Sequence, residues 1–154
     1  RLDLISKVRG IQAAEKYFWS LPDICNSVKT YSCLLNCYGK HGLAYKGLEL
    51  YEKMKAKNIV PDKLVYNYLM KLYQKAGQPE KVLSTFEEMR ESGISADKFT
   101  YFTLIESYIT MNDLDTAEKI LEELQKVAPV HWSLYTLMAN NYIKLELLAR
   151  QKLP

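Results

Sequence analysis

Two columns of tyrosines, repeated at nearly constant spacing, constrain this chain more than any other feature of its sequence. Successive tyrosines within each column are 35, 35 and 34 residues apart. The first column is Tyr31, Tyr66, Tyr101 and Tyr135, and the second is Tyr38, Tyr73, Tyr108 and Tyr142. Other residues recur in step, such as Gly42 with Gly77 and Asp62 with Asp97. A period of this length is typical of proteins built from one repeated supersecondary unit.

The columns divide the chain into repeats within a single repeat domain, 1–154. We place repeats at 28–62 and 63–97, a degenerate repeat at 98–131, and partial repeats at 1–27 and 132–154. Each repeat carries two apolar stripes at helical spacing, which predicts a pair of helices. Since neither helix can bury its stripe alone, the hairpins must stack on one another. We therefore predict an all-α fold, an α-solenoid of helix-turn-helix repeats; its handedness is not given by the pattern.

The repeat 63–97 shows where the helices should begin and end. Gly77 is expected to stop the first helix, because glycine tolerates the left-handed conformation that follows a helix. Pro79 suits the first turn of the second helix, and Gly93 should close it. Asp97 stands where the next helix needs an N-cap, as Asp62 does one repeat earlier. The tyrosine columns share the apolar face with leucines and are predicted to lie in the core.

The repeat resembles the pentatricopeptide repeat. The segments TYSCLL, VYNYLM and TYFTLI resemble its opening, and YEKMKAKNIVPD and FEEMRESGISAD resemble its ending. A tetratricopeptide origin is disfavoured, because neither Trp19 nor Trp132 fits the Trp-x-x-Leu-Gly start of that repeat. The resemblance is to the P-type class and covers essentially the whole chain. It implies a short plant organellar protein that binds single-stranded RNA with one repeat per base.

The resemblance also implies roles for particular positions of each repeat: the fifth residue reads a base together with the last, and the second residue stacks on that base. By position, Ser32 with Asp62 resembles a reader that favours G, and Asn67 with Asp97 resembles one that favours U. The stacking positions hold Lys29, Leu64 and Phe99. An amide or hydroxyl can bond the edge of a base while the carboxylate orients it.

The third and fourth units depart from that pattern. Phe102 occupies the reading position of 98–131 and His131 the last position, and neither resembles a known pair. In the partial unit after it, Thr136 is the fifth residue. These three side chains are expected to make weak RNA contacts at most. Capping alone also accounts for Asp62 and Asp97, whereas we expect Ser32 and Asn67 to face the concave surface.

Other chemistries find little support in the sequence. Cys33, Cys37 and His41 lie at i, i+4 and i+8, yet no short-spaced zinc pattern is present, so buried cysteine is the simpler interpretation. No catalytic residue, metal site or cofactor is predicted, and we expect no enzyme activity. No apolar run is long enough to cross a membrane, and no membrane partner is expected.

Charge is distributed unevenly over the repeats, although the chain as a whole carries +3. The unit 28–62 is basic, 63–97 is balanced and 98–131 is acidic, so RNA contact should centre on 28–97. Our leading hypothesis is RNA binding in a chloroplast or mitochondrion, in support of RNA processing such as splicing or stabilisation. Self-association or a protein cofactor would then supply further specificity. The alternative is a protein–protein interaction scaffold with little intrinsic RNA binding.

Overall fold

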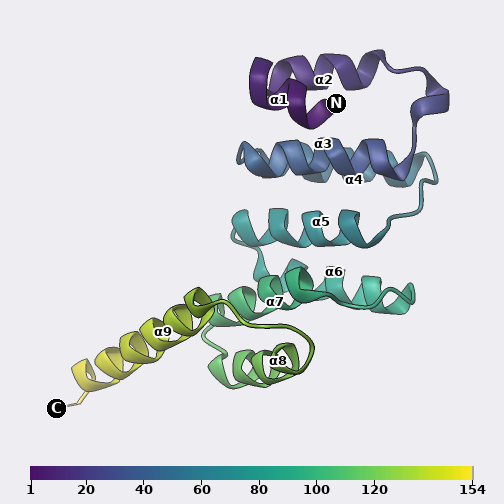
Figure 1. The fold of residues 1–154 in the computed structure, drawn as a ribbon. Helices are drawn as coiled ribbons and strands as arrows, with labels where there is room; N and C mark the ends of the chain where they lie inside the picture. Colours follow the sequence, from purple (N-terminus) through teal and green to yellow (C-terminus); the bar gives the residue numbers. More distant parts are fainter. Residues whose placement is uncertain (154) are drawn as a thin grey trace. The chain divides into compact units, whose positions relative to one another are not determined.

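The computed structural model describes residues 1–153. They fold into two compact units, residues 1–95 and the described residues from 96 onward. The helices of the first unit are α1 (Leu2–Arg9), α2 (Ile11–Ser20), the 3₁₀ turn η1 (Asp23–Cys25), α3 (Val28–Lys40), α4 (Ala44–Ala56), α5 (Lys63–Lys75) and α6 (Pro79–Glu91). The second unit contains α7 (Lys98–Thr110), α8 (Leu114–Val127) and α9 (Trp132–Gln151). The predicted all-α class is confirmed for the described residues (Figure 1).

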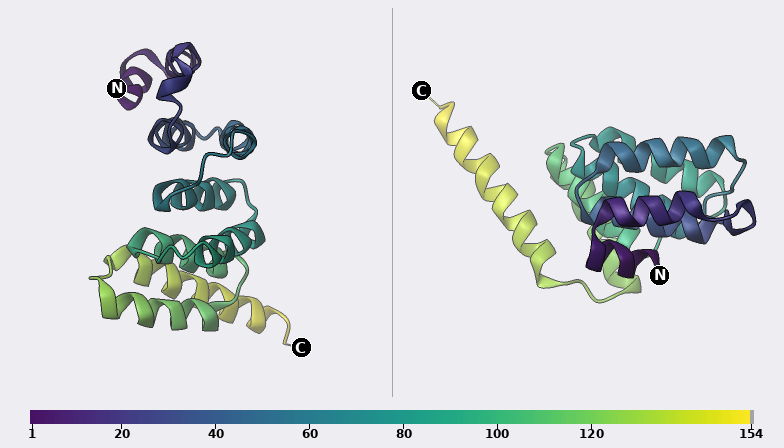
Figure 2. Two further views of the ribbon diagram at one scale, coloured as in Figure 1. Left: turned by 90° about the vertical axis from the view of Figure 1, so that its right-hand side faces the viewer. Right: turned by 90° about the horizontal axis from the view of Figure 1, so that it is seen from above.

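The helices of the first unit form two layers. Helices α1, α3 and α5 stack in one layer, with α1 against α3 and α3 against α5, while α2, α4 and α6 form the other (Figure 2). Each helix pairs with the next one along the chain, and α4 also packs on α5. This arrangement buries one stripe of each helix and leaves the outer side of α3 and α5 open.

Left-handed residues end the helices at the repeat period. Gly42 and Gly77 follow α3 and α5 with φ of 67° and 71°, and Asn112 takes the same position after α7 with φ of 59°. In each case the next N–H reaches back to the carbonyl of a tyrosine in the second column; the pairs are Leu43 to Tyr38 (2.9 Å), Gln78 to Tyr73 (3.0 Å) and Asp113 to Tyr108 (2.9 Å). This backbone closure satisfies carbonyls that a helix end leaves unpaired. Asparagine is the residue other than glycine that most readily adopts this conformation.

A second closure ends α4 and α6 but not α8. Asn58 and Gly93 are left-handed, and the N–H groups of Ile59 and Ile94 donate to Met54 and Met89 at 3.2 Å. The corresponding position after α8 is Pro129, which has no N–H to donate. Ala128, before it, is extended with φ of −155°. The third repeat therefore lacks the backbone hydrogen bond that ends α4 and α6, because proline has no N–H group.

The tyrosine columns enter the core in the first two repeats and leave it at the end of the chain. Tyr31, Tyr38 and Tyr66 are buried, and the Tyr31 ring meets Phe18 edge-on with centroids 5.1 Å apart. Tyr135 and Tyr142 are exposed, so their predicted place in the core is wrong. Helix α9 buries a narrower face, centred on Leu134 and Met138, and the two phenols lie at its edge.

None of the helices among residues 1–153 combines the length and apolarity needed to span a membrane.

Candidate nucleic-acid interface

The outer side of α3 and α5 forms a continuous strip of residues that we call the α3–α5 face. Its members are spaced i, i+4, i+7 and i+11 on each helix, which places them on one side; they are Lys29, Cys33, Asn36 and Lys40 on α3, and Leu64, Tyr68, Lys71 and Lys75 on α5. All eight are exposed or half-buried. Burial raises the pKa of the Tyr68 hydroxyl, so this phenol stays neutral and can donate a hydrogen bond.

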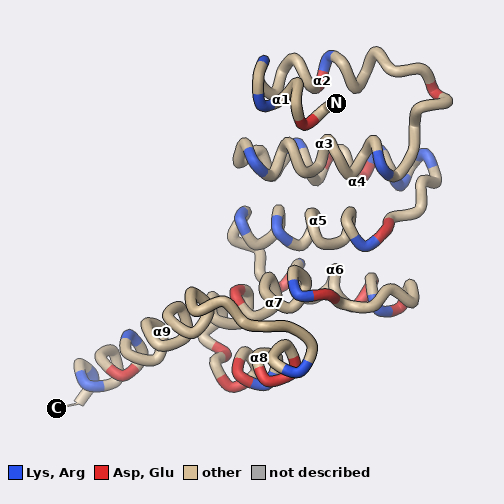
Figure 3. The backbone as a smooth tube through the Cα atoms, viewed as in Figure 1, with Lys and Arg blue, Asp and Glu red and all other residues tan. Residues whose placement is uncertain are grey.

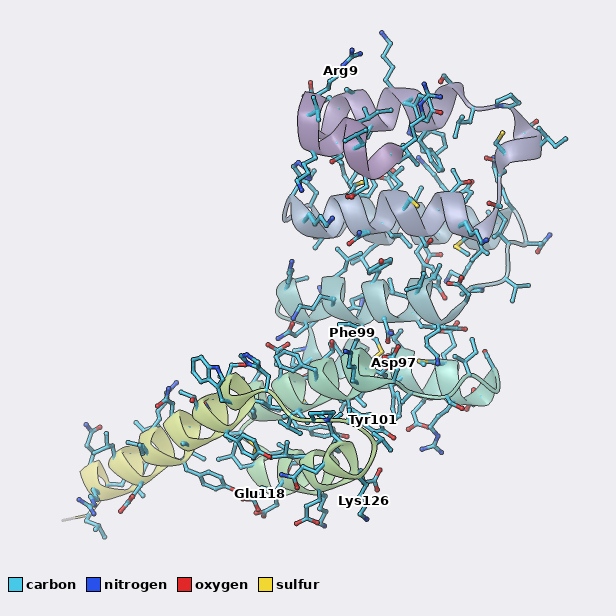
Figure 4. All side chains as sticks on the ribbon, in the orientation of Figure 1. Arg9, Asp97, Phe99, Tyr101, Glu118 and Lys126 are labelled. Atoms are coloured by element: carbon cyan, nitrogen blue, oxygen red, sulfur yellow. The ribbon has the colours of Figure 1, made fainter. Side chains whose placement is uncertain are left out.

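The predicted stacking positions are open to solvent in the first turn of three helices. Lys29 is exposed, Leu64 is 51% exposed and Phe99, in the second unit, is 63% exposed. The Lys98 ammonium lies 5.2 Å from the centre of the Phe99 ring, a cation–π contact. Figure 4 shows Phe99 and Asp97 at the start of α7. An exposed apolar side chain beside a basic one provides the surface that an unpaired base stacks on.

The first predicted reading pair lies in the first unit. Asp62 caps α5, because its Oδ1 accepts a hydrogen bond from the Val65 N–H at 3.0 Å. The expectation that Ser32 is open to the concave surface is wrong, since this residue is only 4% exposed. Its short hydroxyl donates to the Lys29 carbonyl at 2.9 Å, one turn back on α3.

The second predicted pair is divided between the two units, with Asn67 in the first and Asp97 in the second. Asn67 is half-buried on α5, and its side chain or backbone already takes part in interactions there. Asp97 caps α7 more completely than Asp62 caps α5: its Oδ1 accepts from the N–H groups of Phe99 and Thr100, both at 3.1 Å, and from the Thr100 hydroxyl at 3.0 Å. The predicted capping role of both aspartates is confirmed.

The candidate weak contacts of the second unit have local partners. Phe102 is half-buried. His131 caps α9 through Nδ1, which accepts from the Ser133 N–H at 3.3 Å. Thr136 is exposed, and its hydroxyl donates to the Trp132 carbonyl at 3.3 Å.

Lys40 and Lys75 occupy the same position of successive repeats and add charge to the α3–α5 face. Figure 3 shows Lys and Arg positions in blue along α3 and α5. Lys40 is bound to Asp3 at 2.8 Å, and this ion pair raises the pKa of the lysine and lowers that of the aspartate. Lys75 donates instead to the Gly39 carbonyl at 3.0 Å, a neutral partner that leaves its charge uncompensated by that bond. Lys75 was not among the site residues predicted from the sequence, although its spacing of 35 from Lys40 was available as a signal.

The side chains of Cys33, Cys37 and His41 do not point toward a common site. Cys33 is exposed, whereas Cys37 is buried with its Sγ 3.9 Å from the Leu2 carbonyl, and burial raises the pKa of that thiol. His41 lies at the end of α3, as expected, where its Nδ1 donates to the Cys37 carbonyl at 2.9 Å. Among residues 1–153 no group of three His, Cys, Asp or Glu side chains is placed to hold a metal ion.

Helical hairpins at this period, ended by left-handed residues and carrying an open strip on one layer, define a helical-repeat protein. The model of the PPR repeat family matches residues 26–71 and 61–108, and a model of the single PPR repeat matches 99–127. The chain therefore belongs to the pentatricopeptide repeat family.

Relatives and solved structures agree with this assignment. A mitochondrial pentatricopeptide repeat-containing protein of Arabidopsis thaliana is 38% identical over 149 residues, which are 96% of this chain and 30% of that protein. The Arabidopsis large ribosomal subunit protein mL101 (rPPR4) is 46% identical over 63 residues, 41% of this chain and 13% of that protein. The chain thus spans about a third or less of these relatives.

Among solved structures, the pentatricopeptide repeat protein PPR10 in complex with an 18-nt psaJ RNA element matches with a TM-score of 0.73 and 26% identity. The match covers 90% of this chain and 20% of PPR10. A second structure, of PPR10 from maize, matches with a TM-score of 0.70 over 99% of this chain and 24% of that chain, at 20% identity, which bears on the fold alone. The predicted solenoid class is confirmed by this likeness.

Proposed function

We propose that the chain binds single-stranded RNA along the α3–α5 face. The observation that carries the proposal is the repeated chemistry of this face in a pentatricopeptide repeat chain: a stacking position, Lys29 or Leu64, and a basic position, Lys40 or Lys75, recur on α3 and α5. The complex of PPR10 with RNA supports the choice of ligand. Lysine contacts hold phosphates irrespective of sequence, while stacking accepts any base.

Base preference is assigned to two repeats by their positions in the family pattern. We infer that 28–62 favours G through Ser32 and Asp62, and that 63–97 favours U through Asn67 and Asp97. A good base contact discriminates by about 1–3 kcal/mol, so two repeats discriminate by about 2–6 kcal/mol, too little to select one transcript. The remaining repeats of the whole protein, self-association or a protein cofactor would supply the rest. Mitochondrial relatives favour a mitochondrial role in RNA processing such as splicing or stabilisation.

Fluorescence anisotropy with short labelled RNAs tests the phosphate contacts. For single strands log K falls with log salt by about 0.7 per phosphate contact. Lys75→Ala should lower affinity for every RNA and reduce the salt slope by about that amount. Lys119→Ala is the matched control, because Lys119 is an exposed lysine of α8 and is not a member of the α3–α5 face. Absence of binding at low salt, or equal slopes for both variants, would reject the proposal and leave the protein scaffold as the better hypothesis.

The base assignment is tested separately by competition between RNAs that differ at one base. Asn67→Ala should remove a preference for U, and Ser32→Ala a preference for G, while affinity for homopolymers changes little. RNA binding that keeps the same preference in Asn67→Ala would show that the reading positions are wrong although the RNA interface is right.

A further inference from the structure

Tyr68 lies in the middle of the α3–α5 face, between the stacking and the basic position of α5. It follows Leu64 by four residues and precedes Lys75 by seven, which places it about 6 Å from the first and about 10 Å from the second along the helix axis. In a nucleotide the ribose joins the base to the phosphate. A strand whose base stacks on Leu64 and whose phosphate meets Lys75 therefore carries its ribose past Tyr68.

The hydroxyl of Tyr68 lies on the side of α5 that faces α3. The residue is half-buried and packs against the core of the first unit, in which α3 and α5 lie side by side (Figure 1). Burial raises the pKa of this phenol most, the Cys33 thiol raises it further, and the Lys40 ammonium lowers it. Both of these groups belong to α3 and to the α3–α5 face, so the hydroxyl stands where the face passes from one helix to the next.

This hydroxyl is not used by the fold. It makes no hydrogen bond within residues 1–153. In contrast, the hydroxyl of Tyr38 donates to Glu15 at 2.8 Å and that of Tyr51 to Glu88 at 3.1 Å. The Tyr68 hydroxyl can therefore donate a hydrogen bond to a ligand, and accept one from it, without breaking a bond within the protein.

The neighbouring repeats do not offer this chemistry at the same position. Cys33 occupies it in 28–62, and a thiol is only a weak donor. Thr103 occupies it in 98–131, where its hydroxyl donates to the Phe99 carbonyl at 3.0 Å and the residue is buried. A phenol with an unused hydroxyl is thus a property of the repeat 63–97.

We propose that, on an RNA strand bound along the α3–α5 face as the proposed function requires, the Tyr68 hydroxyl bonds the 2′-hydroxyl of a ribose held between α3 and α5. Tyr68 then distinguishes RNA from DNA. A 2′-hydroxyl donates and accepts, as a phenol does, and it is the group that DNA lacks. The half-buried, uncharged setting favours a sugar over a phosphate, because burying a charge costs more than burying a hydroxyl. The exposed Lys75 is the better partner for the phosphate.

Fluorescence anisotropy with an RNA and a DNA strand of the same sequence tests the proposal. Tyr68→Phe keeps the ring and removes only the hydroxyl. It should weaken RNA binding by about two- to tenfold, the effect of one hydrogen bond, and leave DNA binding unchanged. Tyr45→Phe is the matched control, because Tyr45 is an 81% exposed tyrosine of α4 and is not a member of the α3–α5 face; it should change neither affinity.

RNAs that carry a single 2′-deoxynucleotide locate the ribose. At one position the deoxy substitution should weaken binding of the unsubstituted chain by the same factor, and it should have no effect on Tyr68→Phe, since the bond is already absent. Circular dichroism verifies that both variants are folded. An unchanged RNA affinity of Tyr68→Phe, or an equal loss for RNA and DNA, would overturn this proposal while the RNA interface stands. A chain that binds no RNA at low salt would overturn the proposed function and this proposal together.

Discussion

Replacing Gly47 by alanine should raise helix propensity but crowd one packing contact of the first unit, so the two effects have opposite signs. Gly47 lies within α4 and is buried against Leu72 of α5, a side chain that is itself part of the core. A Cβ built at Gly47 would stand 2.5 Å from Cδ1 of Leu72 and 3.3 Å from Cδ2. Gly39 of α3 provides the matched comparison, because a Cβ there would meet the same Leu72 side chain at 3.9 Å, an ordinary contact.

The magnitudes predict opposite signs for the two alanines. Alanine stabilises a helix interior by about 1 kcal/mol relative to glycine. Gly39→Ala keeps part of this gain, about 0.5 kcal/mol, because it lies near the end of α3. At Gly47 the gain is outweighed by overpacking, which costs about 1–3 kcal/mol when a buried side chain must leave its rotamer. We expect Gly47→Ala to lower the free energy of unfolding by about 1 kcal/mol.

Urea unfolding followed by circular dichroism measures both variants. With a slope of about 1–3 kcal/mol per molar urea, the midpoint of Gly47→Ala should fall by about 0.3–1 M while that of Gly39→Ala rises. Adding Leu72→Ala to each variant removes the obstructing methyl groups, and Gly47→Ala should then be stabilising in that background. A midpoint for Gly47→Ala at or above that of Gly39→Ala would refute the packing argument.

Three further predictions concern the core, a cap and a surface hydrogen bond. Tyr31→Phe should stabilise the chain by about 1 kcal/mol, because the buried Tyr31 hydroxyl has no hydrogen-bond partner within residues 1–153; Tyr66→Phe, which removes a bonded hydroxyl, should destabilise it, and urea midpoints compare the two. Asp97→Ala should cost about 1–2 kcal/mol and speed hydrogen exchange in the first turn of α7; unchanged exchange would contradict the cap. The hydrogen bond to Glu118 raises the pKa of Tyr142 to about 12. The contribution of this hydrogen bond to stability is therefore complete below the ordinary tyrosine pKa of 10.0 and is lost as the pH rises through about 12. Glu118→Gln should lower the pKa of Tyr142 in an NMR titration.

The paired helices were predictable because their signals are local. In the repeat 63–97, α5 ends before the left-handed Gly77, α6 begins at Pro79, Gly93 follows its end, and Asp97 caps α7, all as expected. The same stop at Asn112 was not predicted, since asparagine adopts this conformation less often than glycine and the sequence does not show which asparagines do.

The candidate site was less predictable, because side-chain exposure depends on the neighbouring helix. Ser32 occupies the same position of its repeat as Asn67, yet it is buried, and its short hydroxyl bonds to the Lys29 carbonyl of its own helix. Tyr135 likewise holds the position of Tyr31 and Tyr66 in its repeat, yet it is exposed, because α9 buries only a narrow face centred on Leu134 and Met138. Lys75 was recognisable by its spacing alone once the helix face was known.

The hydrogen bonds that end the helices join backbone N–H groups to backbone carbonyls. Only the left-handed position next to them restricts which residue the sequence can have. A segment bounded by two such turns therefore carries its own beginning and end, so copying or deleting it in a gene leaves the hydrogen bonds of the remaining turns intact. Pro129 breaks this rule after α8, because a segment that begins or ends there cannot form the standard turn. Duplication and loss of repeats should thus be tolerated at the turns after α4 and α6, and selected against at the turn after α8.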